Sequence, residues 1–325
     1  MICGGFSFAA MAEPRSKARV LVLFPAALGA AGALSREVQR PMTLDIARIE
    51  RLPHVEAALN YLVPMDEKPY RYAYEPPPPG VPSENGEQVA RRVAIHDLRP
   101  VAAELSLDRE GFALIRQRSA VRDFYDEDEL RKVLYPEAQQ AIAGATGAVE
   151  VIVFDHTIRQ RIPGAVDRAT GTPRQPVSRV HNDYTETSGP QRVRDLLPPK
   201  EAEAWLRGRF AAINLWRPIR APLLDRPLAL CDARSVAAGD FVATDLIYRD
   251  RRGEIYNLAY NPAHRWFYAP AMRHDEALLI KCYDSATDDG RARFVPHGSF
   301  DDPNMPSDAP PRESIEIRTL VRYPD

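Results

Sequence analysis

The 325-residue chain has little cysteine and almost no excess of charge of either sign. Its three cysteines, Cys3, Cys231 and Cys282, form no Cys-x-x-Cys pair, which excludes a disulfide framework and a cysteine-rich zinc site. This usage favours a reducing, intracellular compartment. The chain carries 43 basic and 45 acidic residues, a net charge of −2. A general nucleic-acid binder or anionic-membrane binder needs a basic excess, so this balance argues against both kinds of partner.

Several catalytic signatures are also missing. The sequence contains no Gly-x-Ser-x-Gly elbow, no dinucleotide-binding glycine fingerprint and no His-Glu-x-x-His motif. These absences argue against a serine hydrolase of the elbow type, a nicotinamide or flavin enzyme of the Rossmann type and a zinc peptidase.

Only one apolar run is long enough to raise the question of targeting. Residues 20–34 read VLVLFPAALGAAGAL and follow three basic residues, the outline of a secretory signal within residues 11–34. The run is too short to span a membrane, and Pro25 interrupts it. We expect residues 1–41 to be an N-terminal extension, either disordered or targeting, ahead of a single domain over residues 42–325. The expected location is cytoplasmic, with a targeting signal as the alternative.

Proline is abundant and points to a fold rich in turns. Thirty prolines make up about 9% of the chain, against roughly 5% in average proteins. After Gly147, short apolar runs recur about every dozen residues and are separated by Pro, Gly and Asp. This spacing is typical of an antiparallel sandwich or barrel.

The remaining patterns predict a helical N-terminal third that packs against this barrel. An amphipathic segment over residues 43–66 places Val55, Leu59 and Leu62 on one face. The other expected elements are strands over residues 91–97 and 149–159, and helices over residues 129–143 and 199–209.

The string Val-His-Asn-Asp-Tyr at 180–184 carries the first chemical signal. In a strand, residues two apart point to the same face, so His181 and Asp183 can present an imidazole nitrogen and a carboxylate oxygen to one point. A lone His-x-Asp is weak evidence, but His297 follows in another predicted strand end. Two histidines and one carboxylate form the facial triad of non-haem Fe(II), which leaves coordination positions open.

A second signal lies near the carboxyl end. Arg312 and Ser314 form an Arg-x-Ser pair fifteen residues after His297, in a segment that alternates like a strand. A guanidinium donates two parallel hydrogen bonds to a carboxylate, and a neighbouring hydroxyl adds a third. This pair therefore suits the distal carboxylate of 2-oxoglutarate. Arg318 lies on the same predicted face as Arg312, so alternation alone leaves the choice open, and Lys281 is a further alternative.

Five segments carry a family resemblance. VFDHTIR, VHNDYT, WFYAP, VPHGSFDDP and PRESIEIR resemble the fungal and bacterial Fe(II)/2-oxoglutarate-type oxygenases that include gibberellin desaturase, the aspergillic-acid hydroxylase and the cephamycin methoxylation component. The resemblance covers roughly residues 45 to 323. It implies a mainly β fold with a double-stranded β-helix core, of the jelly-roll or cupin-like kind, flanked by N-terminal helices.

The resemblance also implies an activity and a set of site residues. It implies hydroxylation or desaturation of a small, secondary-metabolite-like molecule, with Fe(II), 2-oxoglutarate and O2 as cofactor and co-substrates. The matching positions imply His181, Asp183 and His297 as iron ligands and Arg312 as the residue that binds 2-oxoglutarate. The substrate, and the choice between hydroxylation and desaturation, stay open.

Other residues have weaker claims. Asn214 and Trp216 lie on the same face of a predicted strand. Asn214 could orient the co-substrate, or its amide could simply be hydrogen-bonded in the core. His156, with Asp155, is a candidate to support the ligands from behind, and Tyr184 to line the pocket. The alternating tyrosines of a proline-rich arm, Tyr70, Tyr72 and Tyr74, either close over a substrate or pack on the barrel wall. Four histidines without other candidate ligands nearby in the sequence are expected to be surface or structural residues: His54, His96, His264 and His274.

Two other functional classes remain open from the sequence. In one, the triad binds a metal without a 2-oxoacid, as in a cupin-like dioxygenase or a metal hydrolase. In the other, the chain is a non-catalytic accessory protein of the same fold. A homo-oligomer or an accessory protein partner is compatible with every one of these hypotheses.

Overall fold

The computed structural model describes residues 19–20, 44–74, 76–165, 173–287 and 290–324. The predicted N-terminal extension and its targeting alternative lie almost entirely outside these residues and stay predictions. Within the described part of the chain, no helix combines the length and the apolar character needed to cross a membrane.

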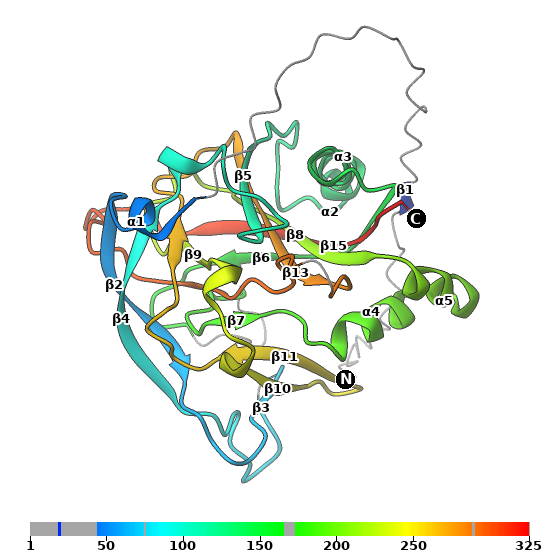
Figure 1. Ribbon diagram of the computed structural model, residues 1–325, viewed down its shortest axis with the longest axis horizontal. Coiled ribbons are helices and arrows are strands. Elements are labelled where there is room, and N and C mark those ends of the chain that lie inside the picture. The colour runs from blue at the N-terminus through cyan, green and yellow to red at the C-terminus, as the bar shows by residue number, and fades with distance from the viewer. Residues whose placement is uncertain (1–18, 21–43, 75, 166–172, 288–289, 325) are drawn as a thin grey trace, which may run out of the picture.

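Two β-sheets face each other and form the body of the protein (Figure 1). The six-stranded sheet has the order β1 (Arg19–Val20), β6 (Glu150–Gln160), β15 (Glu313–Arg322), β8 (Phe210–Pro218), β13 (Glu276–Asp284) and β5 (Phe112–Arg116). The nine-stranded sheet has the order β2 (His54–Leu62), β4 (Gln88–Asp97), β12 (Trp266–Tyr268), β9 (Leu228–Cys231), β14 (His297–Ser299), β7 (His181–Asn182), β11 (Arg252–Leu258), β10 (Phe241–Ile247) and β3 (Tyr70–Tyr72). Strands distant in sequence thus become neighbours, as in a double-stranded β-helix, and the predicted fold class is confirmed.

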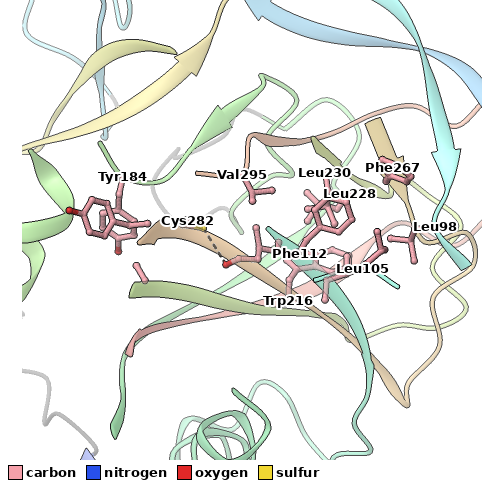
Figure 2. Close-up of a cluster of buried hydrophobic side chains, with 14 of the residues drawn as sticks. Leu98, Leu105, Phe112, Tyr184, Trp216, Leu228, Leu230, Phe267, Cys282 and Val295 are labelled. Carbon is pink, nitrogen blue, oxygen red and sulfur yellow. Dashed lines mark hydrogen bonds between the residues drawn. The ribbon is translucent and has the colours of Figure 1, made fainter. Parts of the chain in front are cut away.

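The main core fills the space between the sheets. Phe112 and Trp216 project from the six-stranded sheet, and Leu230 and Phe267 project from the nine-stranded sheet, into one buried cluster (Figure 2). Each such side chain contributes roughly 1.5–3 kcal/mol when fully buried. This layer holds the two sheets at a fixed spacing and therefore fixes the position of polar side chains at its end.

A second core lies on the outer face of the six-stranded sheet, under the longest helix. Leu134 and Ile142 of the helical segment pack with Ile315 and Ile317 of β15. The predicted alternation along β15 is therefore observed: the isoleucines face the helix, and the intervening polar side chains face the interior between the sheets.

The two helices predicted over residues 129–143 and 199–209 are found. The helical segment consists of α2 (Glu127–Glu129), a π-helical turn η2 (Leu130–Leu134) and α3 (Tyr135–Thr146). Asp126 accepts hydrogen bonds from the main-chain N–H groups of the first turn, and Gly147 ends the helix with a φ of 70°. Helix α5 (Pro199–Arg207) lies where predicted, whereas α4 (Ser188–Leu196) was not predicted. The remaining short helices are α1 (Ile46–Ile49), η1 (Arg99–Val101), η3 (Ala233–Ser235) and η4 (Ala238–Asp240).

The prediction of a helical N-terminal third was wrong. Residues 54–62 form strand β2, which pairs with β4 along its whole length. Val55 and Leu59 fit both a helical and a strand period, but burial alternates through Val55, Ala57, Leu59 and Tyr61. The period of two prevails because β4 supplies the main-chain partners and the nine-stranded sheet buries one face of β2.

Candidate metal centre

Three residues distant in sequence meet at the mouth of the barrel. His181 begins β7 and His297 begins β14, and these two residues pair directly across the neighbouring strands. Asp183 follows β7 immediately. One ligand atom from each of His181, Asp183 and His297 lies within 4.8 Å of the others. The two imidazole rings are 4.6 Å apart between centroids. The structure thus brings together the three residues that the sequence singled out.

Main-chain carbonyls orient both imidazoles. The Nδ1 atom of His181 lies 3.1 Å from the carbonyl oxygen of Arg179, and that of His297 lies 2.9 Å from the carbonyl oxygen of Val295. A carbonyl only accepts, so each Nδ1 carries the proton and each Nε2 keeps its lone pair for the site. Burial lowers the pKa of His181 to about 4, so this imidazole is neutral and able to bind a metal at neutral pH.

The carboxylate of Asp183 is held from its far side. Its Oδ1 lies 3.6 Å from Nε2 of His181, while its Oδ2 accepts a hydrogen bond of 2.8 Å from Nδ2 of Asn214 on β8. The Nε atom of Arg318 is 3.7 Å from the same Oδ2. Burial alone would raise the pKa of Asp183, but the adjacent imidazole of His181 and the charge of Arg318 hold that pKa well below its ordinary value. Asn214 therefore supports the carboxylate.

The guanidinium of Arg318 is already neutralised. Its Nη2 is 2.5 Å from Oε1 of Glu316, and its Nη1 is 3.2 Å from Oδ2 of Asp155 and donates to Thr157. With Asp183, three carboxylates surround this one cation. Arg318 is thus part of the network that fixes Asp183, and Asp155 supports the site through Arg318.

Arg312 is buried without such compensation. The side chain is 2% exposed, lies over the ring of Trp216 and donates from Nε to Ser314 Oγ at 3.0 Å and from Nη1 to the carbonyl of Arg226 at 2.7 Å. Among the described residues, no carboxylate pairs with its guanidinium and its Nη2 makes no hydrogen bond; Asp225 contacts only the main-chain N–H. Burial lowers the pKa of Arg312 to about 9. A bound carboxylate would supply the missing counter-charge.

A cavity of about 940 Å³ opens beside these residues. His181, Asp183 and Arg318 form part of its wall, with Tyr184 and side chains from β6 and α4 around them. His297, Asn214 and Arg312 are almost fully buried and lie outside this lining. The cavity gives a small molecule access to one side of the three-residue cluster.

The other sequence candidates lie elsewhere or only at the margin. His156 lies at the cavity wall, and its ring contacts the hydroxyl of Tyr135 at 2.7 Å, beneath the helix. Lys281 is fully buried and pairs with Asp108 and Asp284 at 2.6 and 2.8 Å, so these two carboxylates neutralise its charge. The tyrosine arm packs on the barrel wall, where β3 pairs with β10, and none of its tyrosines lines the cavity. None of the four remaining histidines joins the cluster: His54, His96, His264 and His274.

Among the cavity residues that the sequence did not single out are Phe154 and Arg192. Phe154 lies at a register shift between β6 and β15, and Arg192 lies on the unpredicted helix α4. The Gly-Pro pair in the first turn of α4 concealed the helix, and no local pattern signals the register shift. Only the three-residue spacing of the apolar residues among the charged ones in QRVRDL could have indicated a helix.

Replacing Asn214 with alanine should weaken Fe(II) binding by about 10- to 100-fold, because loss of a hydrogen bond to a ligand typically has that cost. The measurement is anaerobic Fe(II) titration of the purified variant. Asn261→Ala is the matched control, since Asn261 also donates to a carboxylate, that of Asp240 at 3.1 Å, away from the cluster. Equal iron affinity in both variants would remove Asn214 from the site.

Comparison with known proteins agrees with this geometry. A family model described as an oxidoreductase/YMDC permease-like domain matches residues 59–322. The hydroxylase/desaturase efuI of Hormonema carpetanum is 35% identical over 253 residues, which cover 72% of this chain and 84% of the relative. The alpha-ketoglutarate-dependent dioxygenase phiK of a fungal species is 32% identical over 242 residues, with 72% and 84% covered.

A solved structure is similar over nearly the same region. The iron and alpha-ketoglutarate-dependent endoperoxidase NvfI superimposes with a TM-score of 0.74 at 27% identity, covering 84% of this chain and 99% of that structure. The corresponding sequence from Aspergillus novofumigatus, a Fe(II)/2-oxoglutarate-dependent dioxygenase, is 28% identical over 257 residues, with 75% of this chain and 88% of the relative covered.

Proposed function

Because the chain belongs to the family of these Fe(II)/2-oxoglutarate-dependent hydroxylases and desaturases, we propose that His181, Asp183 and His297 are its iron ligands and that Arg312 binds 2-oxoglutarate. The protein is a non-haem dioxygenase that uses Fe(II), 2-oxoglutarate and O2. The substrate that we propose is a small, secondary-metabolite-like molecule bound in the cavity beside Asp183.

One observation carries the ligand proposal. Two imidazoles and one carboxylate, all within 4.8 Å, match the donor set and number that non-haem Fe(II) oxygenases require. The carbonyl contacts on both Nδ1 atoms leave the two Nε2 atoms for the metal. Bound Fe(II) supplies the dioxygen chemistry that no side chain of this protein can perform.

The protein's own residues position the ligands and the substrates and balance their charges. Asn214 and Arg318 hold Asp183 in one orientation from behind, so the ligand carboxylate needs no reorganisation. The unpaired guanidinium of Arg312, with the hydroxyl of Ser314, offers donors to the distal carboxylate of 2-oxoglutarate. The cavity wall orients the substrate beside the metal, and this orientation decides which C–H bond is oxidised.

The two alternative classes have less support. A metal enzyme without a 2-oxoacid leaves the buried charge of Arg312 unexplained, and the relatives named above are enzymes rather than accessory proteins. The cytoplasmic location and the homo-oligomer or accessory partner stay predictions.

Removal of the metal tests the proposed function. Succinate formation from 2-oxoglutarate should disappear after chelation and dialysis, return on addition of Fe(II), and stay absent with Zn(II), which has no redox chemistry. Activity of equal size with Zn(II), or activity that survives removal of all metal, would refute the proposal.

A further inference from the structure

The cavity wall next to Asp183 contains a polar group without a protein partner. Tyr184 is 5% exposed, and Asn182 anchors its main chain by a hydrogen bond of 2.7 Å to the carbonyl. Its ring packs in the main core, and its hydroxyl points away from the other labelled side chains (Figure 2). This hydroxyl makes no hydrogen bond to any described residue, although buried hydroxyls usually have a partner.

A cation lines the same cavity as this hydroxyl. Arg192 on α4 lines the same cavity, and its guanidinium lies 5.7 Å from the ring centroid of Phe154. Tyr184 lines the same cavity, and Tyr184 and Phe154 both pack in the main core, so the two polar side chains flank one aromatic ring. The Nε atom of Arg192 is buried and has no hydrogen-bond partner in the described part of the chain.

Among the described residues, Asp195 is the only acid within ion-pair distance of Arg192. Its Nη1 reaches Asp195 only at 4.0 Å, and the carboxylate of Asp195 accepts a hydrogen bond of 2.8 Å from Gln191. Other acids of the cavity wall already pair with cations of the chain: Asp155 with Arg318, Glu127 with Arg131, and Asp245 and Glu254 with Lys68. The guanidinium of Arg192 and the hydroxyl of Tyr184 thus line the cavity with the ring of Phe154.

We propose that the substrate carries a carboxylate, which Arg192 binds as an ion pair and Tyr184 binds through a hydrogen bond, while the adjoining apolar part of the substrate stacks against Phe154. The guanidinium of Arg192 only donates, and the hydroxyl of Tyr184 can donate to the same group, so together they favour an anionic oxygen. The ring of Phe154 offers an apolar surface beside them. This inference rests on the proposed function of the same site. Since Tyr184 directly follows the ligand Asp183, a carboxylate held here also fixes which carbon of the substrate lies nearest the iron.

The test compares an acid with its uncharged amide. Equilibrium dialysis of the anaerobic Fe(II)–2-oxoglutarate complex measures the affinity of 2-naphthoate and of 2-naphthamide. The native protein should bind the acid about 10-fold or more tightly, the usual gain from a charge-assisted hydrogen bond. Arg192→Gln should abolish this preference, and Tyr184→Phe should reduce it about threefold, as expected for one neutral hydrogen bond. Arg194→Gln is the matched control, because Arg194 lies on the same helix but pairs with Glu203 at its half-exposed side chain.

The outcomes separate this inference from the proposed function. The visible band of chelated 2-oxoglutarate, recorded in the same samples, shows that each variant is folded and loaded. With the band present, a preference that is lost only in Arg192→Gln and reduced in Tyr184→Phe supports the carboxylate. With the band present, equal affinity for acid and amide, no measurable binding of the acid, or a preference that survives Arg192→Gln overturns it. Absence of the band in the native protein overturns the proposed function itself.

Discussion

Alanine at His181 or Asp183 is expected to abolish 2-oxoglutarate turnover and to remove bound iron. Each residue supplies one of three donors that lie within 4.8 Å of one another, and two donors cannot hold Fe(II) in the facial arrangement. Loss of a residue that only hydrogen-bonds to a ligand lowers metal affinity or activity by about 10- to 100-fold. Loss of a ligand should therefore lower them by more than about 100-fold. Succinate formation and iron content per protein are the two measurements.

A matched control separates loss of the ligand from loss of a histidine. The side chain of His54 is 42% exposed and far from the cluster, and His54→Ala should keep both activity and iron. Retained 2-oxoglutarate-dependent oxidation in His181→Ala or Asp183→Ala would remove that residue from the ligand set.

Replacing Arg312 with glutamine should raise the dissociation constant for 2-oxoglutarate by about 30-fold or more. Truncating one partner of a buried, hydrogen-bonded charge pair costs about 2–5 kcal/mol, and each 1.4 kcal/mol is about tenfold in affinity. Iron affinity should change little, since Arg312 has no contact with His181, Asp183 or His297 among the described residues. Arg312→Lys should restore part of the affinity, because an ammonium keeps the charge but not the paired donors.

Arg318→Gln is the informative comparison. Arg318 faces Asp183, Glu316 and Asp155, so its loss leaves three acids together beside the metal. We expect this variant to alter iron binding more than the affinity for 2-oxoglutarate. The reverse result, weak 2-oxoglutarate binding in Arg318→Gln and normal binding in Arg312→Gln, would transfer the co-substrate role to Arg318.

The sequence predicts this fold best where one period dominates. Strand β6 is predicted correctly from its run of apolar and β-branched residues, and β15 from its alternation. The capped helix ending at Gly147 is predicted from its boundary residues. Strand β2 was misread because Val55 and Leu59 satisfy two periods at once, and only pairing with β4 decides between them. Helix α4 was missed because Gly and Pro in its first turn resemble a loop.

The candidate site was predictable in its composition but not in its charge balance. His181, Asp183 and His297 could be chosen from motif and order because two strand ends meet in a barrel. The two arginines could not be separated, since Arg312 and Arg318 lie on the same face of β15. Their difference depends on neighbours from other strands, above all Asp183 and Asp155, which no local pattern reveals.

Anaerobic titration with Fe(II) and then with 2-oxoglutarate tests the central claim most directly. Chelation of a 2-oxoacid by Fe(II) produces a weak visible charge-transfer band. We predict that the native protein binds Fe(II) and shows this band, and that at the same 2-oxoglutarate concentration the band fades in Arg312→Gln. Iron binding without any band would contradict the 2-oxoglutarate claim, and failure to bind iron would contradict the metal centre itself.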